Sequence, residues 1–177
     1  AIFIPKNVKV IDDNAFKSCT YLHTINFAED SKLEIIGKSA FDGSSIKEII
    51  IPNTVEEIDD EAFANSKLKI ILFESPSKIK IFRHSILKYT KITSLTIPSS
   101  VEIIEEGWCK YLKDLVEIKI DPNNHNFKVL NNKILFRRSE SKYEDEYDVL
   151  MFAARDIKKV HIPFNIKKIE PYAFFNC

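Results

Sequence analysis

The sequence predicts a β-rich α/β solenoid: a right-handed coil with a parallel β-sheet along one face and short helical or 3₁₀ turns elsewhere. Two observations predict this fold. An apolar strand motif recurs every 22 to 24 residues over most of the chain, and apolar columns follow it at fixed offsets. One such unit cannot bury its own apolar side, whereas stacked copies form a continuous core.

The strand motif has the form I/L-x-x-I/L/V-x-I/F, and its last two apolar positions lie on one face of a strand. Proline directly follows several of the closing residues and, because it lacks an N–H, should end the strand at a corner. The closing residues are Ile4, Phe27, Ile51, Phe73, Ile97, Ile120 and Ile162, and the prolines are Pro5, Pro52, Pro98 and Pro163.

Three further apolar columns follow the corner at constant offsets. They are Val8, Leu33, Val55, Ile79, Val101 and Ile166; then Ile11, Ile36, Ile58, Phe82, Ile104 and Ile169; then Phe16, Phe41, Phe63, Leu87, Cys109 and Phe174. Each coil returns the chain in the same direction, so the stacked strands must be parallel. The segment before the third column carries acidic residues and alanine and predicts a short helical or 3₁₀ turn.

The arrangement IPxxVxxIxxxAFxxC stands as IPKNVKVIDDNAFKSC at 4–19 and IPFNIKKIEPYAFFNC at 162–177. It resembles the BspA-like leucine-rich repeats of bacterial and protozoan surface-type proteins, and the resemblance covers essentially the whole chain. It implies a leucine-rich repeat solenoid that contacts host or matrix proteins at a cell surface.

Residues 1–177 are expected to form a single solenoid of about seven coils, the last one incomplete. The long step between Ile120 and Ile162 predicts an enlarged coil with an insertion at 121–161, in which the strand-like runs 133–136 and 148–152 form a hairpin with a charged tip. The chain starts at a strand end and stops within a coil without a polar cap. We therefore expect a fragment of a longer array, whose uncapped ends allow end-to-end self-association.

The sequence predicts no catalytic, cofactor-binding or metal-binding residues, and so no enzyme. Cys19 and Cys177 share a column but lie too many coils apart for a disulfide. No CxxC or HxxxH spacing occurs, and His23, His84 and the other two histidines fall on different coils. The acidic run from Glu144 to Asp148 lacks the pattern of a calcium loop and is interpreted as a solvated hairpin tip.

The composition restricts the classes of binding partner but does not determine the cellular compartment. Lysine plus arginine and aspartate plus glutamate balance at 26 each, which argues against nucleic-acid binding. No apolar run is long enough for membrane insertion. The family resemblance implies a surface or secreted location, and a cytoplasmic one is the alternative.

The outward side of the main sheet carries the candidate partner-binding residues. Three large aliphatic residues, Ile50, Ile70 and Leu72, fall at outward positions of adjacent coils. A contiguous exposed apolar patch with a polar rim commonly marks an interaction site. The rim residues are Thr96, Glu117 and Lys119, the charged pair contributing orientation. The alternative interpretation is that strands simply favour aliphatic residues, or that a terminal tail covers them.

These observations favour a non-enzymatic protein–protein interaction module, with adhesion or host and matrix protein binding as its role. The alternative is an intracellular structural or scaffolding repeat protein, which the balanced charge and unpaired cysteines allow. A signal peptide with an anchor in the flanking sequence would favour adhesion, and intracellular modules there would favour scaffolding.

Overall fold

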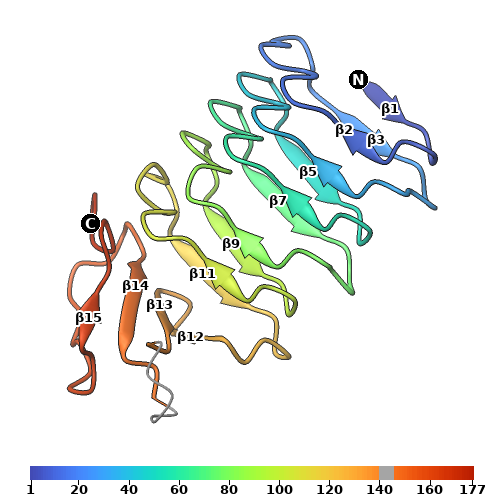
Figure 1. Ribbon diagram of the computed structural model, residues 1–177. Helices are drawn as coiled ribbons and strands as arrows, with labels where there is room; N and C mark the ends of the chain where they lie inside the picture. The colour runs from blue at the N-terminus through green and yellow to red at the C-terminus, as the bar shows by residue number, and fades with distance from the viewer. Residues whose placement is uncertain (140–145) are drawn as a thin grey trace.

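The computed structural model describes residues 1–139 and 146–177 and shows a solenoid built from two rows of short parallel strands. The chain ends lie at opposite ends of the stack (Figure 1). The main row contains β1 (Ile2–Ile4), β3 (Ile25–Phe27), β5 (Glu48–Ile51), β7 (Ile70–Phe73), β9 (Ser94–Ile97) and β11 (Glu117–Ile120). The second row contains β2 (Val10–Ile11), β4 (Ile35–Ile36), β6 (Glu57–Ile58), β8 (Ile81–Phe82) and β10 (Ile103–Ile104).

The apolar columns determine where the strands of both rows end. Each of the first six main-row strands ends at its predicted closing residue, and each second-row strand ends at the predicted middle column. Within β5, Ile49 and Ile51 are buried, while Ile50 between them is 55% exposed. This alternation follows from the two-residue period of a strand, which places the apolar pair in the core. The predicted parallel solenoid is thus confirmed.

The prolines divide the main row into pairs of hydrogen-bonded strands: β1 with β3, β5 with β7, and β9 with β11. At the end of each pair, the residue after the second strand donates its N–H to the carbonyl that closes the first, as Glu74 does to Ile51 at 3.0 Å. Pro52 and Pro98 occupy the equivalent place in the next coil and have no N–H to donate. The ladder is interrupted before each of these two coils.

The segment before the phenylalanine column forms hydrogen-bonded turns, so the expectation of a helical or 3₁₀ segment is wrong. Alternate N–H groups point to the next coil, as Phe16 donates to Ala40 at 2.8 Å, while the intervening Lys17 donates back to Asn14 at 3.0 Å. Residues with positive φ recur here, among them Asn14 at 59° and Gly107 at 77°. Left-handed residues at these positions prevent a helix from continuing.

No helix in the described part of the chain is long and apolar enough to cross a bilayer.

Phenylalanine rings stack along the first three coils of the core. The ring centroids of Phe16 and Phe41 are 5.3 Å apart and nearly parallel, and those of Phe41 and Phe63 are 5.5 Å apart. Phe41 and Phe63 are fully buried, whereas Phe16 in the first coil is only partly buried. Leu87 and Cys109 continue the column as buried residues of smaller volume.

The enlarged coil contains the predicted hairpin and one strand more. β12 (Phe127–Leu130), β13 (Ile134–Arg137) and β14 (Val149–Ala153) are antiparallel neighbours, and β15 (Lys168–Ile169) pairs with β14 in parallel. The expected hairpin corresponds to β13 and β14, while β12 was not predicted. The motif ending at Ile162 forms no strand, contrary to expectation.

In the acidic run predicted for the hairpin tip, Glu144 and Asp145 lie outside the described residues, and Glu146 is exposed. Asp148, which the run includes, is not solvated but buried. Its carboxylate accepts hydrogen bonds from the backbone N–H and the hydroxyl of Ser139 at 2.7 and 2.8 Å. These bonds compensate for the burial of the charge, which explains how Asp148 can be buried directly before β14.

Arg155, two residues after β14, connects three successive coils through its guanidinium group. The side chain is 8% exposed, and its centre lies 4.8 Å from the Phe152 ring. Its three nitrogens donate to backbone carbonyls at 2.8 to 3.4 Å. The acceptors are the carbonyls of Cys109, Leu112, Ala153, Tyr172 and Ala173.

The three cysteines are free, as predicted: Cys109 is buried, and Cys19 and Cys177 are exposed. Burial raises the pKa of the Cys109 thiol, although nearby Arg155 acts in the opposite direction. We therefore expect a chromogenic disulfide reagent to titrate two thiols rapidly in the native protein and three after denaturation without reductant. Detection of only one thiol in the denatured chain would reveal a disulfide and contradict the columnar arrangement.

Candidate functional site

The outward aliphatic residues of β5 and β7 form one patch on the main sheet. The parallel register places Ile50 beside Leu72 and Glu48 beside Ile70. Ile50, Ile70 and Leu72 are 55%, 47% and 50% exposed. Side chains at directly paired positions of neighbouring strands are close enough for contact. The structure thus brings together the three aliphatic residues that the sequence analysis singled out.

The remaining predicted residues lie on β9 and β11, at the side of the patch nearer the enlarged coil. Thr96 is exposed and pairs with Lys119 on the neighbouring strand. Lys119 Nζ lies 2.9 Å from Glu117 Oε2, which also accepts a hydrogen bond from the Ser94 hydroxyl at 2.8 Å. The bonds from Lys119 and Ser94 lower the pKa of Glu117. Glu117 therefore stays ionised and holds Lys119 in a defined place.

The structure adds Phe3 to this face, a residue that the sequence analysis missed. Phe3 is 59% exposed and pairs with Asn26 on β3. It occupies the same position in β1, one residue before the closing isoleucine, that Ile50 occupies in β5. The offset that identified Ile50 could therefore have identified Phe3.

A shallow groove runs between these exposed side chains. It has a volume of about 370 Å³, and most of its wall comes from β3, β5 and β7. The outward residues that line it are Thr24, Asn26, Glu48, Ile50, Ile70 and Leu72. The groove lies over the interruption of the ladder between β3 and β5. An open, partly apolar groove of this kind can take up projecting side chains from a partner.

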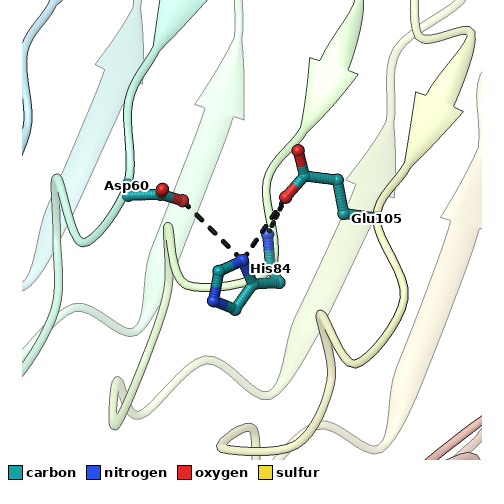
Figure 2. Close-up of side chains that lie close together, drawn as sticks. All are labelled: Asp60, His84 and Glu105. Carbon is teal, nitrogen blue, oxygen red and sulfur yellow. Dashed lines mark hydrogen bonds and ion pairs between the residues drawn. The ribbon is translucent and has the colours of Figure 1, made fainter.

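A second group of functional side chains comes together at the turns after the second row. Asp60 follows β6, His84 follows β8 and Glu105 follows β10, and one ligand atom from each lies within 4.8 Å of the others (Figure 2). No metal ligands were predicted, because this group shows no local spacing in the sequence. These residues are one coil apart, and aligning successive coils would have found them.

The chain matches the family model for the BspA-type leucine-rich repeat region in six copies, over residues 1–116, 30–140 and 144–177. No curated protein matches the sequence.

Solved structures with the same fold include three bacterial proteins. The pneumococcal vaccine antigen PcpA has a TM-score of 0.86 and 26% identity, over 98% of this chain and 42% of its own. A leucine-rich cell surface protein from Faecalibacterium prausnitzii has a TM-score of 0.75 and 20% identity, over 99% of this chain and 52% of its own. A leucine-rich repeat protein from Eubacterium ventriosum has a TM-score of 0.66 and 19% identity, over 86% of this chain and 44% of its own.

The chain thus spans about half the length of these proteins or less. A repeat solenoid of this kind is typically an interaction scaffold without catalytic activity. The two rows of parallel strands, the repeated columns and the match over most of the sequence agree with one another. This chain belongs to the BspA-type leucine-rich repeat family.

Proposed function

We propose that this domain binds a protein partner through the outward face of its main sheet and has no catalytic activity. The aliphatic centre of the site is formed by Ile50, Ile70 and Leu72, and its rim by Thr96, Glu117 and Lys119. The observation that carries the proposal is the contiguous exposure of these aliphatic side chains in hydrogen-bonded register. Such a patch with a polar rim is a common feature of interaction sites.

The arrangement favours a protein over a small ligand. The groove beside the patch is shallow, and the surface is continued by side chains of four neighbouring coils, from β3 to β9. β5 and β7 pair only with each other, and the patch lies on their outward face, so a partner seated there would be recognised through side chains. The Glu117–Lys119 pair presents both charges at the rim, where charges contribute more to orientation than to affinity.

We further propose a cell-surface or secreted location and a role in adhesion, treating residues 1–177 as one repeat domain. Membership of the BspA-type family supports this, and the description of the pneumococcal relative as a vaccine antigen agrees with it. The three free cysteines favour the alternative, an intracellular scaffold, because disulfides form mainly in oxidising compartments. A signal peptide and anchor in the flanking sequence would distinguish the first role from the second.

The binding proposal is tested by the double substitution Ile50→Ser with Leu72→Ser. A matched control is Val10→Ser with Ile103→Ser, two second-row residues that are 46% and 52% exposed. Extracellular matrix proteins are passed individually over immobilised parent, patch variant and control, and any equilibrium binding is measured. Burying an aliphatic side chain contributes about 1.5–3 kcal/mol, so losing two should weaken binding at least about tenfold.

The control should bind as the parent does, and both variants should keep the parent urea midpoint because all four side chains are exposed. Equal binding by parent and folded patch variant would show that this face is not the site. Loss of binding in the control alone would instead place the site on the second row.

A further inference from the structure

The group of Asp60, His84 and Glu105 has the composition of a transition-metal site. Each residue comes from a different coil, and each is held at the turn that follows a second-row strand (Figure 2). The set offers one imidazole nitrogen and two carboxylate oxygens. Imidazole ligands suit zinc and related first-row metals, whereas calcium and magnesium prefer oxygen ligands throughout.

The ligand atoms of the group all lie within 4.8 Å of one another, and the two distances from His84 approach those between the ligands of a bound metal. His84 Nδ1 lies 3.4 Å from Glu105 Oε2 and 3.9 Å from Asp60 Oδ1. Ligands of a tetrahedral zinc ion with ordinary bond lengths are about 3.3–3.4 Å apart. The first distance matches, and the second needs a shift of Asp60 of a few tenths of an ångström. The three side chains are 35% to 53% exposed, which gives them room to adjust and gives an ion access.

Two further features of the group favour a bound cation. Glu105 Oε2 accepts a hydrogen bond from the His84 backbone N–H at 3.0 Å, which fixes it beside the imidazole. Asp60 Oδ1 is shielded from solvent and has no hydrogen-bond partner among the described residues. A shielded carboxylate oxygen without a donor is costly, and a cation would satisfy it.

The surrounding charge also favours a cation. Arg83 lies beside the group, with its guanidinium 2.6 Å from Glu57, 3.4 Å from Asp59 and 3.8 Å from Glu105. One guanidinium thus faces three carboxylates, and Asp60 adds a fourth acid nearby. The local excess of negative charge attracts a divalent ion.

The position of the group gives a bound ion a structural effect. The second row is interrupted between β6 and β8: β6 pairs only with β4, and β8 pairs only with β10. Asp60 lies on one side of this interruption, and His84 and Glu105 lie on the other. An ion held by all three would connect coils that no second-row ladder connects.

We propose that Asp60, His84 and Glu105 form a binding site for a divalent first-row transition metal, of which zinc fits best. The ion would join the coils on either side of the interrupted second row, with water completing its coordination. This site lies on the turns after the second row and is separate from the proposed partner face on the main row.

The test uses isothermal titration of Zn²⁺, and separately Ca²⁺, into the full chain carrying Cys19→Ser and Cys177→Ser. These two substitutions remove exposed thiols that would otherwise bind zinc. We expect one zinc per chain, with affinity at least tenfold lower after His84→Ala or Asp60→Asn, and weaker binding of calcium. His161→Ala, at another exposed histidine, is the matched control and should bind zinc as the parent does.

Zinc should also raise the urea midpoint of the parent chain and of His161→Ala, but not that of folded His84→Ala. The proposal is overturned if the parent binds no zinc saturably, if His84→Ala and Asp60→Asn bind it as tightly as the parent, or if calcium binds more tightly than zinc. Circular dichroism of each variant separates loss of the site from loss of the fold.

Discussion

Replacing Arg155 with methionine should lower the free energy of unfolding by about 4 kcal/mol or more, because several charged hydrogen bonds are lost together. Methionine keeps most of the apolar stem that packs near Phe152. It removes the guanidinium donor from five carbonyls of three coils, of which those of Cys109, Tyr172 and Ala173 also accept a backbone N–H. A hydrogen bond to a charged group contributes about 1.5–3 kcal/mol, so the loss of several outweighs the backbone bonds that remain.

Equilibrium urea unfolding measures this effect, with Arg155→Lys as the comparison. Lysine retains the charge but lacks the planar fork that reaches carbonyls in three directions. Arg155→Lys should therefore lose some unfolding free energy, but less than Arg155→Met. If Arg155→Met unfolds at the parent midpoint, the guanidinium does not hold these coils together.

Truncating the fully buried ring at the inner end of the aromatic stack, Phe63→Ala, should cost about 3–5 kcal/mol. Phe63 is fully buried and packs in parallel against Phe41, with a ring-centroid distance of 5.5 Å. Its removal leaves a cavity that the neighbouring coils cannot fill without moving. Phe16→Ala should cost clearly less, because Phe16 is partly exposed and contacts the stack on one side only.

The pair is compared by urea unfolding at equal protein concentration, with unfolding followed by far-UV circular dichroism. A central residue loses contacts to coils on both sides, whereas a residue in the first coil loses contacts to one. Equal shifts of the midpoint for the two variants would contradict the stacked-coil account.

The strand rows could be predicted because a strand end is marked by an apolar residue at constant offset. Ile51 and Ile58, for example, close β5 and β6 where their columns require. The turns could not be predicted from the acidic and alanine residues before Phe63. Those turns depend on left-handed backbone at positions filled by asparagine, serine, glutamate, tyrosine or glycine, a set with no common side-chain signal.

The enlarged coil shows another limit of the repeat pattern. Ile157, Val160 and Ile162 match the strand motif, yet no strand forms there. β14 pairs with β13 on one side and with β15 on the other, so neither edge of β14 is left for the motif that ends at Ile162. A local motif forms a strand in a solenoid only when the adjacent coil offers a partner.

The proposed partner face could be predicted because inward and outward residues alternate along a strand. Ile50 and Leu72 face outward because they stand between buried or partly buried apolar neighbours, an alternation that is visible in the sequence. The group around His84 was missed because its members are separated by whole coils. Side chains that meet through stacking become visible only when the coils are aligned position by position.

The most direct test of the central claim is site-specific photocrosslinking to a partner identified in the binding measurements. A photoreactive residue is placed at Leu72 in one variant and at Ile103 in another, both exposed positions on opposite rows. The account predicts a covalent adduct with the partner from position 72 and none above background from position 103. Adducts from position 103 alone, or equally from both, would contradict recognition through the main sheet.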